Sequence, residues 1–75
     1  MKSDDELDAV GLLCPLPVLK ARKRLQGLKS QQILLMRADD PAAQLDVPHF
    51  CNESGHELVQ VENHGSEKHF YIRKK

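Results

Sequence analysis

A cysteine followed at once by two closely spaced prolines is the feature of this chain best suited to covalent chemistry. Cys14 precedes Pro15, Leu16 and Pro17, at the point where a strand-like segment gives way to a helix-like one. At the start of a helix, free backbone N–H groups and the positive end of the helix dipole favour the thiolate, which is the nucleophilic form of cysteine. We therefore expect Cys14 to accept a group, hold it covalently and pass it on.

The two prolines are expected to stiffen the entry to the helix. Pro15 is predicted at the first helical position, where its fixed φ suits the helix and its missing N–H costs little. Pro17 falls in the first turn, where no intrahelical donor is needed. Because the rings also remove two N–H donors, we expect only a moderate lowering of the Cys14 pKa. A buried structural cysteine is the alternative that local pattern leaves open.

No second reactive group accompanies Cys14 in the sequence. All four histidines lie in the second half of the chain, without zinc-ligand spacing: His49, His56, His64 and His69. We expect no metal and no cofactor, since a glycine-rich phosphate loop is also missing. Sulfur exchange by a thiolate needs no base near neutral pH. Cys51 shares a helical face with Val47 and Phe50 and is predicted to fill core space, with a redox disulfide between Cys14 and Cys51 as a lesser alternative.

Length and composition predict one small domain in a reducing compartment. The 75 residues suit a single domain, 1–75, in which we expect residues 1–6 to be a disordered acidic tail. No apolar run approaches the ~20 residues that a membrane span requires, and the N-terminus lacks the apolar stretch of a signal peptide. We therefore expect a cytoplasmic protein, with its cysteines reduced and no membrane partner.

The charges are segregated along the chain, although the formal net charge is zero. Residues 9–38 contain no acid, whereas residues 39–67 contain seven acids and no lysine or arginine. Four basic residues lie on the helix that Cys14 opens, and we predict that they form a partner-docking surface: Lys20, Arg22, Lys23 and Arg24. The alternative function is a non-covalent RNA-binding or regulatory module that uses this basic helix.

The pattern of apolar residues predicts the element order β-α-β-α-β-β. Strands are expected at residues 7–10, 32–38, 58–61 and 70–72, with a hairpin turn at residues 63–66. The first helix should span Pro15–Leu28. The second should begin with Asp40 as N-cap, break near Asp46–Val47 because of Pro48, and end at Gly55. The predicted fold is an α/β two-layer sandwich, a four-stranded mixed sheet with two helices on one face.

The segment Gly11–Pro17 resembles the Cys-Pro-x-Pro signature of the TusA family, also called SirA-like. Further similarities follow in order along the chain: Asp39–Ala42, Asp46, Pro48, Phe50–Cys51, His56–Leu58 and Tyr71–Lys74. The resemblance extends from Leu7 to the C-terminus. It implies the same β-α-β-α-β-β sandwich and a sulfur carrier with sulfurtransferase-type chemistry but no catalytic machinery of its own.

In such a carrier, the resemblance implies that Cys14 receives a persulfide from a cysteine desulfurase. The sulfur then passes to relay proteins, most typically for 2-thiolation of the tRNA wobble uridine, while related members serve molybdenum cofactor synthesis or sulfur oxidation. Direct contact with nucleic acid is not expected. Leu13 and Leu16 stand where the name-giving member has an arginine and an acid. Both flank the sulfur, so both bear on partner choice.

Overall fold

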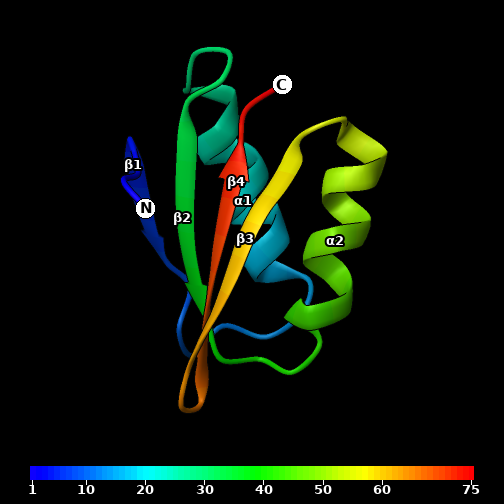
Figure 1. Cartoon of the computed structure of the whole chain (residues 1–75). Coiled ribbons are helices and arrows are strands. Elements are labelled where there is room, and N and C mark those ends of the chain that lie inside the picture. The colour runs from blue at the N-terminus through cyan, green and yellow to red at the C-terminus, as the bar shows by residue number, and fades with distance from the viewer.

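A mixed four-stranded sheet forms one layer of the protein and two helices form the other (Figure 1). The computed structural model describes all 75 residues. The elements in chain order are β1 (Asp5–Asp8), α1 (Leu16–Gln26), β2 (Ile33–Ala38), α2 (Ala43–Ser54), β3 (Glu57–His64) and β4 (Glu67–Arg73). The strand order is β1-β2-β4-β3, with β1 parallel to β2 and β4 antiparallel to both of its neighbours. The predicted fold class is confirmed.

The hydrophobic core lies between the sheet and the helices. Alternate residues of a strand point to opposite faces, so Leu34 and Met36 of β2 face the helices, together with Phe70 of β4. From α1, Ala21 and Leu25 are buried at helical spacing and meet these strand residues, with Val18 and Leu28 half-buried beside them. On α2 the core residues are Val47, Phe50 and Cys51. The predicted core position of Cys51, on the helical face that it shares with Val47 and Phe50, is therefore confirmed.

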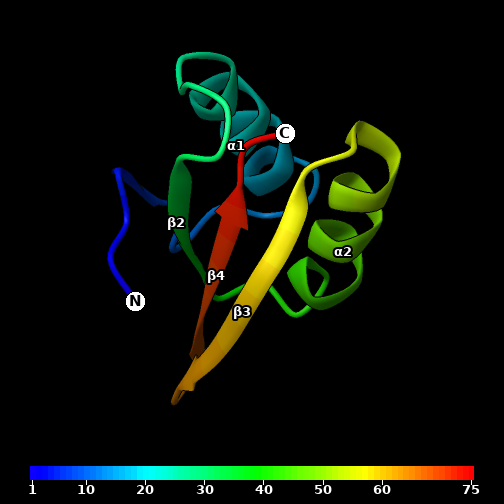
Figure 2. The same cartoon turned by 45° about the horizontal axis from the view of Figure 1, so that its top comes forward.

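The opposite face of the sheet carries no helix (Figure 2). Its centre is apolar, because Leu35 of β2 and Tyr71 of β4 are cross-strand partners and both are buried. Around them the side chains are polar, including Arg37 and His69, which are also paired across the two strands. This face is referred to below as the open face.

The first strand begins earlier than the sequence predicts, since β1 spans Asp5–Asp8 rather than residues 7–10. The backbone N–H of Asp4 donates to the Ile33 carbonyl over 2.8 Å, which places the strand start beside β2. After Asp8 the chain turns, because the Asp8 carboxylate accepts the Val10 N–H at 3.0 Å and Gly11 has a φ of 85°. The sheet thus includes Asp5 and Glu6, within the segment expected to be a tail.

The C-terminal hairpin is longer than its apolar residues indicate. Strands β3 and β4 extend to Glu57–His64 and Glu67–Arg73, and the turn consists of Gly65 and Ser66. Gly65 has a φ of 66°, a conformation that glycine adopts without strain. The added strand residues are mostly polar and lie at the solvent-facing end of the hairpin, so hydrophobicity alone did not reveal them.

Helix α1 is shorter at both ends than the predicted span Pro15–Leu28. Its N-cap is Pro15, which therefore precedes the first helical residue instead of occupying it, and Pro17 is buried within the first turn. The helix ends at Gln26, because Gly27 closes the last turn and donates its N–H to the carbonyls of Arg24 and Leu25.

The prediction that Pro48 breaks the second helix is wrong. Helix α2 is continuous through Pro48 and begins at Ala43, with Ala42 as N-cap in place of Asp40. Pro48 removes the N–H that would bond to the carbonyl of Gln44, and both residues are exposed, so water can satisfy that carbonyl. Gly55 ends the helix with a φ of 84°, as predicted.

Replacing Leu25 by alanine should destabilise the protein by about 2–5 kcal/mol, because Leu25 is fully buried between α1 and the sheet. Urea unfolding followed by circular dichroism measures this loss. The matched control is Leu45→Ala on α2, whose side chain is 78% exposed and should change stability by less than about 0.5 kcal/mol. Equal losses at the two positions would contradict the described core.

Candidate functional site

Cys14 lies in the loop between β1 and α1 and is exposed. Because β1 and β2 are parallel, their carboxyl ends meet at one edge of the sheet, where the loops that lead into α1 and α2 lie close together (Figure 1). Two hydrogen bonds join these loops. The Cys14 N–H donates to Asp40 Oδ2 over 2.6 Å, and the Gly11 N–H donates to Asp39 Oδ1 over 2.9 Å. The loop that carries Cys14 is thus held against the loop that follows β2.

Asp40 serves two loops at once. Its Oδ1 accepts the N–H of Ala42 at 3.1 Å while its Oδ2 accepts the N–H of Cys14. The sequence indicated only the first of these roles, in the form of a helix cap. The second could not be predicted from local pattern, since it joins residues 26 positions apart.

The expected lowering of the Cys14 pKa is wrong, because the surroundings of the sulfur raise it. The largest cause is a hydrogen bond from the thiol to the Asp46 carboxylate, which stabilises the protonated form. Partial loss of solvent and the negative charges of Asp46 and Asp40 raise the pKa of Cys14 further. The sequence did not indicate Asp46 as a neighbour of the sulfur.

The start of α1 offers few N–H donors that could counteract the rise in the Cys14 pKa caused by these carboxylates. Pro15 and Pro17 have no N–H, the Leu16 N–H donates to the Leu13 carbonyl over 2.9 Å, and the Cys14 N–H is bonded to Asp40. Most of the backbone donors that stabilise a thiolate at other helix starts are therefore missing or already occupied here.

An open groove of about 330 Å³ runs beside Cys14 between the two helices. We call it the Cys14 groove, and its other lining residues come from α1, α2 and the preceding loop: Pro15, Val18, Leu19, Arg22, Asp46, His49, Phe50 and Glu53. Apolar side chains and both signs of charge therefore surround the sulfur. Such a mixture suits contact with the surface of another protein.

Three exposed leucines lie near Cys14, and we call them the leucine rim: Leu13 precedes it in the chain, Leu16 begins α1, and Leu19 lines the Cys14 groove. Leu13 is 69% exposed, Leu16 46% and Leu19 49%. Exposed apolar side chains gathered in one place are typical of protein-binding surfaces. The two leucines that depart from the family pattern, Leu13 and Leu16, thus belong to the surface that a partner of Cys14 would meet.

The four basic residues predicted to dock a partner do not form one surface. Arg22 lines the Cys14 groove. Lys20, Lys23 and Arg24 line a separate depression beside Asp5 and β1. There Arg24 Nη1 donates to the Glu6 carbonyl over 2.7 Å and lies 3.4 Å from Asp5 Oδ1, so its charge is partly neutralised. Only Arg22 is positioned next to the sulfur.

Cys51 is buried in the core, with 3% of its surface exposed, as its position on the helix predicts. Burial raises the pKa of its thiol to about 11, which makes it a poor nucleophile at neutral pH. Both cysteines are free. The chemistry of the site therefore depends on Cys14.

Comparison with known proteins agrees with this arrangement. A family model described as "Sulfurtransferase TusA" matches residues 5–74. The chain belongs to the TusA family. The sulfur carrier protein TusA of Allochromatium vinosum is 44% identical over 71 residues, which cover 95% of this chain and 93% of the relative. The crystal structure of a SirA-like protein from Desulfitobacterium hafniense matches with a TM-score of 0.81 and 21% identity over 92% of this chain and 95% of that one, which shows the shared fold.

The segment Cys14–Pro17 spans the exposed loop before α1 and the first turn of that helix. Neither helix of this family member has the length and apolar character that crossing a membrane demands. The residues that sequence reasoning missed, Asp46, His49 and Phe50, come from α2. They reach the site because α1 and α2 pack side by side.

Asp46→Asn should make Cys14 react faster with iodoacetamide at neutral pH. The substitution removes the carboxylate that most strongly raises the Cys14 pKa, so a larger fraction of the sulfur is thiolate at a given pH. The rate measured against pH should shift to lower pH than in the parent protein. Glu53→Gln is the matched control, since Glu53 lines the same groove but does not affect the Cys14 pKa. A profile for Asp46→Asn that is unchanged or shifted to higher pH would contradict the assigned role.

Proposed function

We propose that the protein is a sulfur carrier that accepts a persulfide sulfur on Cys14 from a cysteine desulfurase and delivers it to a thiol of an acceptor protein. The observation that carries this proposal is the position of Cys14, which is exposed, is hydrogen-bonded to the loop that follows β2, and lies near the exposed leucines of the rim. A sulfur atom in that position can enter the active site of another protein. Membership of the TusA family and the carrier name of its relative support the same function.

The transfer balances without an external oxidant or reductant. The Cys14 thiolate attacks the outer sulfur of the donor persulfide, so that one S–S bond forms as the donor S–S bond breaks. The donor cysteine leaves as a thiolate and takes up the proton that Cys14 has lost. Delivery to the acceptor repeats the exchange in the same sense, and Cys14 returns to a thiol. No general base is required, and the carrier has no catalytic machinery of its own.

The carboxylates around Cys14 give the free carrier a protected sulfur. Because Asp46 and Asp40 raise the Cys14 pKa, the thiol stays mostly protonated until a partner binds. A partner that brings positive charge to Asp46 would reverse this effect and expose the thiolate.

We place the carrier in the cytoplasm and propose 2-thiolation of the tRNA wobble uridine as the destination of the sulfur. This choice rests on the resemblance to the TusA family along most of the chain. Acceptor proteins receive the sulfur, and the carrier itself need not touch tRNA. The leucines of the rim at positions 13 and 16 are expected to select these proteins.

The RNA-binding alternative is less well supported. Three of its four basic residues lie apart from Arg22, and Arg24 is bonded to β1. The chain also has two phenylalanines, one tyrosine and no tryptophan, which leaves little aromatic surface for stacking bases. A gel-shift series over salt concentration with Cys14 blocked separates the two functions, because RNA binding would depend steeply on salt and ignore the thiol.

Incubation with a cysteine desulfurase and free cysteine should add one sulfur atom to the protein, as measured by intact mass. Cys14→Ser should abolish this gain because the only exposed thiol is lost. Cys51→Ser is the matched control and should keep it, since Cys51 is buried. A sulfur gain that persists in Cys14→Ser would show that the carrier site has been misassigned.

Arg22→Glu should slow sulfur transfer from the desulfurase by roughly tenfold, since it reverses the charge within the Cys14 groove. Lys20→Glu changes charge equally on the same helix but lies in the separate depression, so its rate should stay close to that of the parent. Single-turnover transfer assays followed by mass spectrometry measure both rates. Equal slowing by the two variants would indicate a general charge effect instead of docking at the groove.

A further inference from the structure

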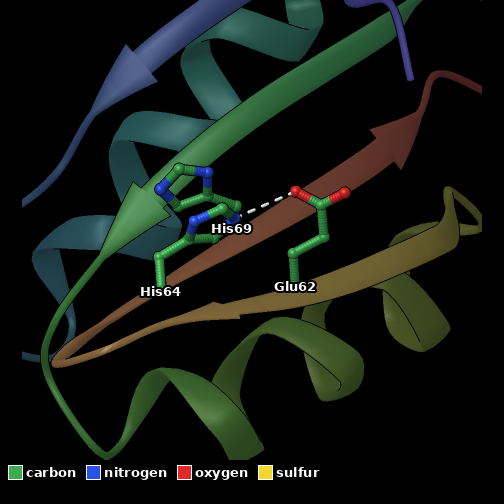
Figure 3. A group of neighbouring side chains, drawn as sticks. All are labelled: Glu62, His64 and His69. Carbon is green, nitrogen blue, oxygen red and sulfur yellow. Dashed lines mark hydrogen bonds and ion pairs between the residues drawn. The ribbon is translucent and has the colours of Figure 1, made fainter.

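A cluster of side chains able to bind a cation lies on the open face of the sheet. The helices that form the Cys14 groove cover the other face. It consists of Glu62 and His64 of β3 and His69 of β4 (Figure 3). One ligand atom from each residue, a carboxylate oxygen or a ring nitrogen, lies within 4.8 Å of the other two. The proposed sulfur chemistry uses none of them.

The strand register explains why these residues converge. Glu62 and His64 are two positions apart on β3, so their side chains point to the same face. Glu62 is also the direct cross-strand partner of His69 in the antiparallel pair of β3 and β4. Sequence reasoning considered helical and loop spacings, and it could not see the cluster because the hairpin was predicted to be shorter.

The spacing of the ligand atoms is close to that of a metal site. His64 Nε2 and Glu62 Oε1 are 3.1 Å apart. Zinc bonds of about 2.0–2.2 Å in a tetrahedral site imply ligand atoms roughly 3.3 Å apart, so this pair already has the required separation. The rings of His64 and His69 are stacked with centroids 3.9 Å apart. The ligand nitrogen of His69 lies within 4.8 Å of the other two ligand atoms, so a small rotation of its side chain is needed to complete a tetrahedral arrangement.

Neighbouring side chains hold the carboxylate in place. Gln60 Nε2 donates to Glu62 Oε2 over 2.6 Å, and the Tyr71 hydroxyl donates to Glu62 Oε1 over 3.5 Å. Metal ligands in proteins are commonly oriented by such outer contacts.

The charges around the cluster are compatible with a bound cation. Glu67 Oε1 lies 3.4 Å from His69 Nε2 and adds a second carboxylate. Two cations oppose a bound metal ion: the N-terminal ammonium, whose charge acts on Glu62, and Arg37, which is paired with His69 across β2 and β4. Its Nη2 lies 3.3 Å from Asp8 Oδ2, so its charge is partly offset by β1.

We propose that Glu62, His64 and His69 bind a divalent first-row transition-metal ion such as Zn²⁺, with water completing the coordination. Two imidazoles and one carboxylate suit Zn²⁺ and Cu²⁺, whereas Mg²⁺ and Ca²⁺ prefer oxygen ligands alone. The site is independent of the proposed carrier function.

Isothermal titration with ZnCl₂ tests the site in the full, untagged chain carrying Cys14→Ser, which removes the exposed thiol as a competing ligand. One ion should bind per chain. In this background, His64→Gln and His69→Gln should each weaken binding by roughly tenfold or more. His49→Gln is the matched control, because His49 is an exposed histidine on α2 outside the cluster, and it should bind as the Cys14→Ser parent does.

Both cluster histidines lie at the surface or partly exposed, so the variants should fold, which circular dichroism verifies. Imidazole ¹H–¹⁵N spectra provide a second measurement, in which Zn²⁺ should shift the ring signals of His64 and His69 and leave those of His49 unchanged. Undiminished binding in both His64→Gln and His69→Gln would overturn the proposal. So would a dominant shift at His49.

Discussion

The hydrogen bond between the Cys14 N–H and the Asp40 carboxylate is the interaction on which the functional arrangement depends. It joins the loop after β1 to the loop after β2, and the second carboxylate oxygen of Asp40 fixes the approach to α2. The position of the sulfur relative to α2, and therefore to Asp46 and Phe50, follows from this one contact. A parallel pair of strands provides the geometry, because it brings both loops to the same edge of the sheet.

The exposure of Cys14 and the protonation of its thiol have opposite effects on its reactivity. An exposed thiol is open to partners, but it is also open to oxidation and to reaction with other electrophiles. The two carboxylates raise its pKa and so lower the fraction of reactive thiolate, while leaving the sulfur accessible. Accessibility is thus set by the backbone at the start of α1, whereas reactivity is set by side chains that follow β2.

The fold could be predicted from the sequence where residues bury apolar surface with a regular period. Ala21 and Leu25 of α1 lie in the core at helical spacing, Leu34 and Met36 of β2 lie there at the alternate spacing of a strand, and Cys51 of α2 lies there as predicted. The environment of Cys14 could not be predicted, because Asp46 reaches the sulfur through tertiary packing. Likewise, polar residues extend β3 to His64, so hydrophobicity did not reveal the hairpin end.

The Cys14 groove lies beside the sulfur between the two helices, and this bears on how the proposed relay proceeds. A donor and an acceptor that both dock in this groove must take turns at Cys14. The overall rate of sulfur transfer then depends on how quickly the donor dissociates after it has given up its sulfur. Weak, rapidly exchanging encounters serve such a shuttle better than tight complexes.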